Sequence, residues 1–314
     1  MSWFLSRLTP RLFQAAGVVL LAGILSFLMM SALPGDAAFR VAAARFGYDN
    51  LTSEAAATVR AELAANPAGL AAFGDWMLGI VQFDLGLSLV SGEPVWHELS
   101  HQLGATLELS SVALLLTLLI GLPLGVFAGL RAGGWLDRLL LPLTALFRAL
   151  PQFLLGLILI VVLAVQLRWL PAAGYGEPRH LFLPALTLAL GLSAAVARVS
   201  RDAMVRVVNE PYYDYARWKG LSAWQVWSRH GLRNIAVPVL TYLGLQFIAL
   251  IEGVVVVESI FGWPGIGHAM VHAVFHRDVP IVQGTVLVLG LSFVLINLLL
   301  DTLLGWIDPR WHHE

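Results

Sequence analysis

The segment at residues 97–101 has the residue types that most directly suggest catalysis. It matches the pattern H-E-x-x-H, in which His97 and His101 share one helix face and can bind zinc, while Glu98 can activate a zinc-bound water. The longer form of the motif has a third histidine six residues after the second, and Leu107 stands there. Leucine cannot bind a metal, so a membrane zinc metallopeptidase is kept only as an alternative.

Three further histidines, His268, His272 and His276, recur every four residues. On a helix their rings would advance slowly around one face and could hold a metal ion. The other interpretation, which we favour, is that they are polar residues facing water near a membrane span. The chain has no cysteine, which excludes disulfides and thiolate chemistry. We therefore expect no cofactor and no metal, with these histidines as the candidate ligands if a metal does bind.

The elements that carry these residues must lie in a lipid bilayer. Of the 314 residues, 58% are hydrophobic and 12% are charged, whereas soluble domains are about 25% charged. So few charges cannot cover a soluble globule of this length, which excludes a soluble enzyme and a disordered chain. A net charge of −1 gives no basic field, so we expect membrane lipid and no nucleic acid as a partner.

Six runs without Asp, Glu, Lys or Arg are long enough to cross the bilayer as helices. They hold 24, 22, 19, 18, 18 and 22 residues, and a helix rises about 1.5 Å per residue against a hydrocarbon layer of about 30 Å. We predict an all-α integral membrane protein with six transmembrane helices in a single domain, residues 1–314. The predicted spans are 12–33, 107–130, 143–167, 181–197, 235–256 and 279–301, with an extracytoplasmic loop at 36–104 and a cytoplasmic loop at 198–233.

The distribution of charge predicts which side each loop faces. If both termini, residues 131–148 and loop 198–233 share one side, that side holds 13 Arg and Lys against 7 Asp and Glu, and the other side holds 6 against 13. Because positive residues gather at the cytoplasmic face, we predict that both termini are cytoplasmic. The runs themselves contain no Asp, Glu, Lys or Arg, which argues against a second alternative, an ion-coupled secondary transporter.

Loop 198–233 contains the signals for two short helices separated by a break. Pro211 suits a first helical turn, and Gly220 suits the position just after a last turn. Ser222 and Gln225 then have the spacing of a capping box. The loop is aromatic and basic, so from composition it can lie on lipid headgroups or dock in a protein groove. One helix face is predicted to hold Tyr212, Tyr215, Ala216 and Lys219.

The motifs of this loop resemble the cytoplasmic signature of ABC-importer permeases, in particular the dipeptide, oligopeptide and nickel branch. The stretch DYARWKGL at 214–221 leads to Pro238, and the eighteen positions from Gly220 to Pro238 match the spacing of that branch. Trp218 departs from the pattern, since a small residue is usual there. Further segments that resemble the branch, in order along the chain, are 33–36, 79–92, 105–109, 258–267, 277–280, 297–301 and 308–310.

The resemblance implies a permease subunit with the type I ABC-importer fold, multi-pass in a bacterial inner membrane. Such a permease works with a second homologous permease, two ATP-binding subunits and an extracytoplasmic solute-binding protein. The implied function is ATP-driven import of di- or oligopeptides or nickel. The chain has no P-loop pattern and a single lysine, Lys219, so we predict that it is not itself an enzyme.

The resemblance also implies two sets of functional residues. Residues 211–221 are expected to form the coupling helix that docks in the ATPase groove. The expected ATPase-coupling residues are Tyr212, Asp214, Tyr215, Ala216, Arg217, Lys219, Gly220, Leu221 and Arg229. The expected residues of the motif at the outer face are Glu258, Phe261, Trp263, Pro264, Gly265 and Gly267.

Overall fold

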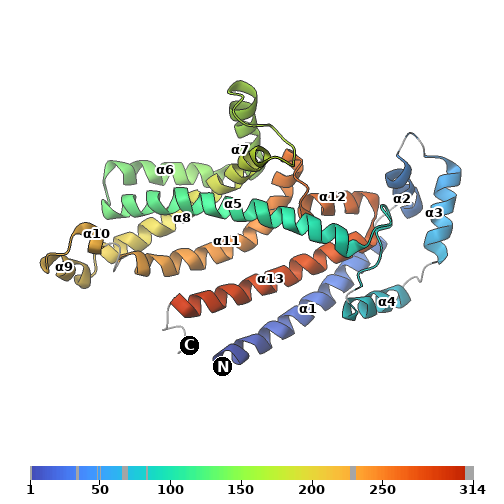
Figure 1. Ribbon diagram of the computed structural model, residues 1–314, viewed down its shortest axis with the longest axis horizontal. Helices are drawn as coiled ribbons and strands as arrows, with labels where there is room; N and C mark the ends of the chain where they lie inside the picture. The colour runs from blue at the N-terminus through green and yellow to red at the C-terminus, as the bar shows by residue number, and fades with distance from the viewer. Residues whose placement is uncertain are drawn as a thin grey trace. The chain divides into compact units, whose positions relative to one another are not determined.

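The computed structural model of the chain describes residues 2–32, 35–47, 49, 51–65, 70–82, 84–226 and 231–307. Within these ranges the structure is helical apart from loops and one isolated bridge between Leu87 and Pro94, which confirms the all-α prediction. The helices (Figure 1) are α1 (Ser2–Ala32), α2 (Ala37–Phe46), α3 (Ser53–Ala65), α4 (Leu70–Val81), α5 (Val95–Leu130), α6 (Trp135–Ala149), α7 (Gln152–Leu159), the π-helix η2 (Ile160–Gln166), α8 (Pro178–Val208), α9 (Pro211–Trp218), α10 (Ala223–Val226), α11 (Leu232–Phe261), α12 (Ile266–His276) and α13 (Val279–Ile307).

Four of the described helices are long and apolar enough to cross a membrane, namely α5, α8 and most of α1 and α13. Two bent pairs qualify when each pair is taken together. In the first pair, Trp135–Ala149 and Gln152–Gln166 meet at 103°, and the second pair consists of Val254–Phe261 and Ile266–His276. By length and composition the described chain therefore offers four to six spans. The exact span limits and the orientation of the termini stay predictions.

The third predicted span, 143–167, is not one straight helix. α6 ends at Ala149, and Leu150 adopts an extended backbone with φ −75° and ψ 125°. Pro151 explains this end, because proline lacks an N–H and disfavours the helical conformation of the residue before it. Helix resumes as α7 and passes into the π-helix η2. Hydropathy detects an apolar segment here but not its bend, because it averages over a window of residues.

The chain divides into two compact units whose segments alternate along the sequence. The first unit comprises Met1–Thr106 and Pro264–Leu298, and the second comprises Leu107–Trp263 and Leu299–Glu314. Since the structure separates two units, the single membrane domain expected from the sequence stays a prediction.

In the first unit, a buried carboxylate fixes the turn that precedes α5. Asp278 lies just before α13 and accepts hydrogen bonds from the Ser88 hydroxyl and from the backbone N–H groups of Leu89, at 3.1 Å, and Val90, at 3.3 Å. A carboxylate that accepts several such bonds is well compensated for its burial. α2 packs on α3 around a small core of Ala38, Val41, Ala42, Ala56 and Val59.

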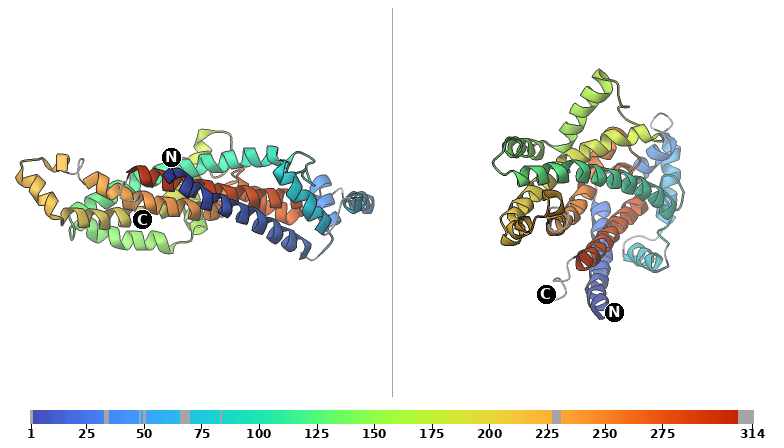
Figure 2. Two further views of the ribbon diagram at one scale, coloured as in Figure 1. Left: turned by 90° about the horizontal axis from the view of Figure 1, so that it is seen from below. Right: turned by 60° about the vertical axis from the view of Figure 1, so that its left-hand side comes forward.

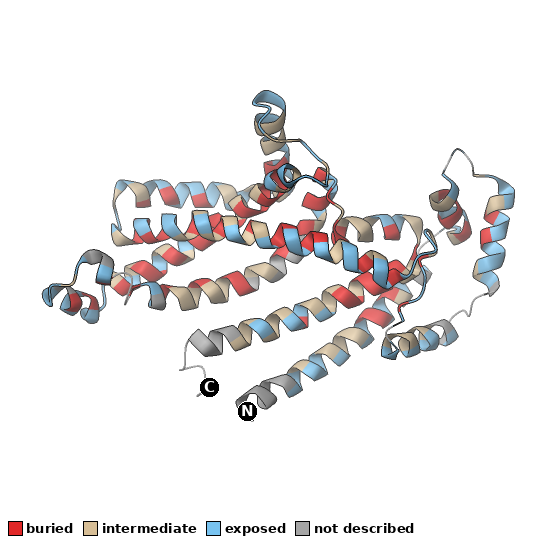
Figure 3. Cartoon of the chain, in the orientation of Figure 1, coloured by how far each residue is buried: buried red, intermediate tan, exposed pale blue. Residues whose placement is uncertain are grey.

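In the second unit, α8 is the helix on which the others pack. It contacts α6, α7, α9 and α11, and buried residues run along most of its length (Figure 3). A hydrophobic core of this unit joins α5, α8 and α11 to the two short helices beyond α8. Its buried members are Val126, Val196, Ala203, Met204, Val207, Tyr213, Ala216, Val226, Ile235, Val239 and Leu243.

Three glycines in α5, Gly121, Gly125 and Gly129, allow this helix to lie close against α8. A Cβ atom at Gly121 would be 2.8 Å from the carbonyl oxygen of Ser193, and one at Gly129 would be 2.7 Å from the carbonyl oxygen of Arg201. Both distances are too short for a carbon–oxygen contact, so only glycine fits without a shift. Small residues four apart are a common way for helices to approach each other in lipid.

Replacing Gly121 with alanine is therefore expected to loosen the contact of α5 with α8. Gly104 is a matched control in the same helix, because a Cβ atom there meets nothing within 4 Å. In detergent, Gly121→Ala should unfold at a lower temperature than the natural chain. The expected loss in free energy of unfolding from such overpacking is about 1–3 kcal/mol. Gly104→Ala should be neutral or stabilising. Equal melting temperatures for the two variants would contradict the close approach.

Candidate functional site

The helical break predicted in loop 198–233 is present in the second unit. α9 begins at Pro211, and after its end the Leu221 N–H donates to the Ala216 carbonyl at 3.3 Å, with Gly220 at φ +83°. That positive φ favours glycine over any side chain. α10 follows at once, and Figures 1 and 2 show both short helices beyond the ends of α8 and α11.

The predicted capping box opens α10. The Ser222 N–H donates to the Gln225 side-chain oxygen at 2.9 Å, and the Gln225 N–H donates to the Ser222 hydroxyl at 3.3 Å. Two backbone donors at the helix start are thereby satisfied, as the serine and glutamine spacing indicated.

The inner face of α9 differs from the predicted one. Tyr213 and Ala216 are 5% and 6% exposed and belong to the core of the second unit. Ala216 therefore faces the core, and the prediction that it shares an exposed face with Tyr215 is wrong. Tyr213 was missed by the sequence reasoning, although its spacing of three residues from a small alanine could have indicated a buried helix face. α9 is thus fixed to α8 and α11 by side-chain packing, and not only by its chain connections.

The outer face of α9 carries exposed aromatic and charged side chains. Tyr215 is 56% exposed and Trp218 is 83% exposed. The Lys219 ammonium lies 4.6 Å from the centre of the Tyr215 ring, a cation–π contact, and Asp214 is exposed as well. This face is suited to contact a protein groove by aromatic packing and charge.

Other residues of the predicted coupling set lie around this face. Leu221 is partly buried against the core, next to Gly220. The backbone of Arg217 continues α9, whereas Arg229 lies outside the described residues.

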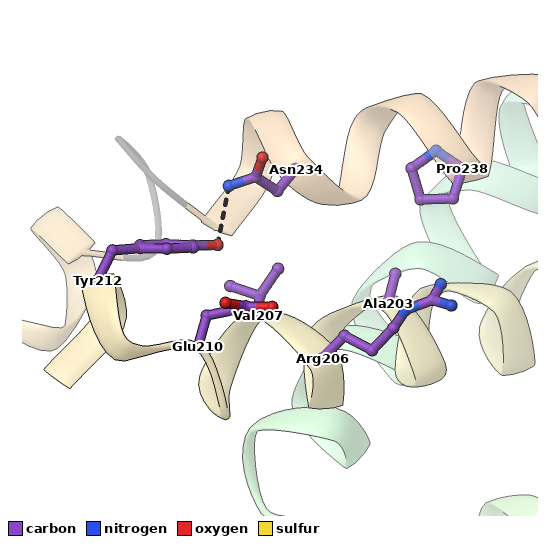
Figure 4. Close-up of a pocket in the computed structure, with 7 residues that line it drawn as sticks. All are labelled: Ala203, Arg206, Val207, Glu210, Tyr212, Asn234 and Pro238. Carbon is purple, nitrogen blue, oxygen red and sulfur yellow. Dashed lines mark hydrogen bonds between the residues drawn. The ribbon is translucent and has the colours of Figure 1, made fainter.

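Tyr212 ties α9 to α11. The Asn234 amide donates to the Tyr212 hydroxyl oxygen at 2.9 Å (Figure 4). Burial raises the pKa of the Tyr212 phenol, the hydrogen bond from Asn234 lowers it, and the nearby Glu210 carboxylate raises it again, with a net upward shift. The phenol is therefore neutral near pH 7, and its oxygen stays an uncharged acceptor for the amide.

A buried ion pair holds the end of α8, just before α9, to α6. The Arg201 guanidinium donates to both carboxylate oxygens of Asp137, at 2.9 and 2.8 Å, and the Gly133 N–H donates to the same carboxylate at 2.8 Å. Asp137 is only 3% exposed, so this two-pronged pairing compensates a charge that has lost its water. Sequence reasoning missed the pair, because nothing in the separate loops 131–148 and 198–233 specifies their partner.

In the second unit, residues 258–263 of the predicted outer motif end α11. Gly262 has φ +62°, and the Trp263 N–H donates to the Glu258 carbonyl at 2.9 Å, which closes the helix. The Trp263 ring meets the edge of the Tyr175 ring, with 4.8 Å between ring centres. Glu258, Phe261 and Trp263 are all buried, so they shape this end of the helix and do not form an open contact surface.

In the first unit, the remaining motif residues begin α12. Pro264 leads into Gly265, which occupies the position before the first turn, and Gly267 is buried in that turn. The Ile266 N–H donates to the Thr106 hydroxyl at 2.9 Å. Thr106 belongs to the segment 105–109 that also resembles the family, so two such segments meet here.

The histidine patterns lie on helices, as assumed, but without the arrangement of a metal centre. In α12 the ring centres of His268 and His272 are 4.6 Å apart, and those of His272 and His276 are 5.8 Å apart. Among the described residues no group of three or more His, Cys, Asp or Glu side chains is placed to hold a metal ion.

The H-E-x-x-H segment lies in the first turns of α5. Its two histidines, His97 and His101, are exposed, and Glu98 accepts a hydrogen bond from the Ser91 hydroxyl. The geometry of this segment therefore does not support the zinc metallopeptidase alternative.

Together, these apolar helices of membrane length indicate a multi-pass membrane protein with a helix–break–helix segment beyond α8 and α11. Residues 121–313 match the model of the family described as binding-protein-dependent transport system inner membrane components, and the chain belongs to that family. The match confirms the resemblance to ABC-importer permeases. The family is a transport permease of the inner membrane and not an enzyme, and neither the peptidase nor the secondary-transporter alternative is supported.

Curated relatives align along nearly the whole chain. A putative peptide transport system permease protein of Brucella suis biovar 1 is 38% identical over 97% of this chain and 98% of its own length. A probable peptide ABC transporter permease protein of Sinorhizobium fredii is 36% identical over 96% and 97%. The glutathione transport system permease protein GsiC of Escherichia coli O6:H1 is 36% identical over 99% and 100%.

Breaking the ion pair at the end of α8 is expected to destabilise the chain strongly. Arg201→Gln leaves the Asp137 charge buried without an ionic partner, which costs about 3–5 kcal/mol. Adding Asp137→Asn removes that charge and should restore much of the loss. Thermal unfolding of the natural chain, both single variants and the double variant in detergent forms the test cycle. If the double variant loses as much free energy of unfolding as the two single variants added together, the pair is not coupled.

Proposed function

We propose that this chain is one of two permeases of an ATP-driven importer that carries short peptides into the cytoplasm. The proposal is supported by family membership and by full-length relatives whose names refer to peptide or glutathione transport. Glutathione is itself a tripeptide, so the two names share one cargo class. Nickel, the other cargo implied by the sequence resemblance, has no comparable support in these relatives.

The proposed contact with the ATPase subunits is the outer face of α9, and the two-faced structure of this helix is the observation that carries the proposal. Tyr215, Trp218 and Lys219 are exposed while Tyr213 and Ala216 are packed in the core. A partner that binds the exposed face can therefore displace α9 as a whole. Because Tyr213 and Ala216 pack against α8 and α11, that displacement is passed to both long helices. A second permease, two ATP-binding subunits and an extracytoplasmic binding protein complete the proposed assembly.

In such an assembly, ATP-driven closure of the motor subunits would switch the permeases between two states by rigid-body movement. Binding energy and hydrolysis are supplied by the partners. The permease contributes the path and the mechanical connection, which agrees with a chain in which no P-loop pattern occurs.

Cargo is tested by reconstituting the complex with its binding protein in proteoliposomes that contain ATP. Initial uptake of labelled dipeptides, longer peptides, glutathione and nickel ions is then compared. Uptake of peptides that depends on both ATP and the binding protein is the expected result. Uptake of nickel alone would overturn the peptide assignment.

Replacing Gly220 with valine is expected to uncouple transport from the motor. A β-branched residue at φ +83° costs about 1–2 kcal/mol in backbone strain, which shifts the equilibrium between the native and a displaced end of α9 about tenfold toward the displaced one. Uptake should fall about tenfold while the amount of inserted protein is unchanged. Gly47→Val is the matched control, because Gly47 has φ +80° and open space around it but lies in the predicted extracytoplasmic loop, far along the chain from α9. Equal transport by the two variants would contradict coupling through α9.

A further inference from the structure

A cavity of about 360 Å³ lies where α8, α9 and α11 meet (Figure 4). Its volume is within the range of small-molecule sites, about 300–1,000 Å³. All of its lining residues belong to the second unit, so the cavity is formed within one compact body. They are Ala203, Arg206, Val207, Glu210, Tyr212, Asn234 and Pro238.

Two opposite charges line this cavity without neutralising each other. Arg206 and Glu210 are four residues apart, a spacing that usually pairs them on a continuous helix. α8 ends at Val208, so Glu210 lies beyond the helix, and no ion pair joins it to Arg206. Figure 4 shows the guanidinium toward Pro238 and the carboxylate toward Tyr212. In the described part of the chain neither side chain has a hydrogen-bond or ionic partner.

The charges limit what can occupy the cavity. An anion such as phosphate would meet the Glu210 carboxylate, and a simple cation would meet the Arg206 guanidinium, so one charge would be repelled in either case. An apolar molecule would desolvate both groups without compensation. A molecule with one carboxylate and one ammonium group satisfies both, because arginine binds carboxylates with two parallel hydrogen bonds.

We propose that this cavity binds a small zwitterion, either a free amino acid or a short peptide, with its carboxylate at Arg206 and its ammonium group at Glu210. Ala203, Val207 and Pro238 supply apolar wall for a side chain or backbone. The further consequence rests on the proposed function and on the predicted cytoplasmic position of loop 198–233. On that side the ligand is the product of import, and its binding at the base of α9 slows further import.

The test uses the reconstituted complex with ATP and glycylglycine trapped inside the proteoliposomes. The binding protein and a labelled peptide are added outside, so only complexes whose ATPase subunits face the lumen contribute. For each protein, initial uptake with lumenal glycylglycine is divided by uptake without it. The natural complex should show a ratio well below one. N-acetyl-glycylglycine lacks the ammonium group, glycylglycine amide lacks the carboxylate, and neither should have this effect.

Variants separate this cavity from the transport path. Arg206→Gln and Glu210→Gln should each weaken the effect of lumenal glycylglycine about tenfold or more, as expected for loss of a charge-assisted bond. Arg206→Lys keeps the positive charge and should retain part of the inhibition by lumenal glycylglycine. Arg198→Gln is the matched control, because Arg198 is an exposed arginine of α8 outside the cavity. Equal inhibition of all variants, or equal inhibition by the blocked peptides, would overturn the proposal.

Binding measured without transport distinguishes failure of this proposal from failure of the proposed function. Labelled glycylglycine is titrated against the purified complex without ATP or binding protein. Binding that Glu210→Gln weakens supports the cavity site even if no peptide uptake is found. If an ATPase subunit fills the cavity in the complex, no such binding occurs and the proposal fails.

Discussion

The structure depends first on how closely helices can approach when lipid surrounds them. Lipid tails are as apolar as leucine, so two helices gain little from burying side chains and must gain from close packing instead. In the second unit, Gly121, Gly125 and Gly129 remove the side chains between α5 and α8. Thr117 then comes near enough for its hydroxyl to approach the Ala189 carbonyl at 3.5 Å as well as its own helix. α8 thereby becomes the fixed support for α6, α7, α9 and α11.

A charged contact completes this support where α8 ends. Arg201 and Asp137 are the side chains that hold the last turns of α8 to α6, and the pair is largely closed off from solvent. Buried pairs are sensitive to geometry, because the cost of desolvation is repaid only when every oxygen and N–H is matched. The extra bond from Gly133 and the additional pairing of Arg201 with Asp202 supply that match. α9 therefore starts from a position that side chains on two helices determine.

The sequence predicted the features that depend on neighbouring residues and missed those that depend on distant ones. Pro211, Gly220 and the Ser222–Gln225 pair specify local backbone geometry, and each was placed correctly. The partner of Arg201 is 64 residues away, and no local pattern identifies it. The four-residue glycine spacing in α5 is a local pattern that indicates a close helix contact, but it does not identify α8 as the partner helix. For the functional site, the loop was located, whereas the inward direction of Ala216 required the core around it.

These constraints determine how a movement at α9 can spread. Tyr213 and Ala216 pack in one core with Val207 of α8 and Ile235 of α11, so a displacement of α9 is shared by both long helices. The hydrogen bond between Tyr212 and Asn234 is a second contact of α9 with α11, and both residues line the cavity. A packed interior transmits strain between the elements that contact each other. An occupant that contacts α8, α9 and α11 together would oppose their relative movement, which is the physical reason for the slowing of import proposed above.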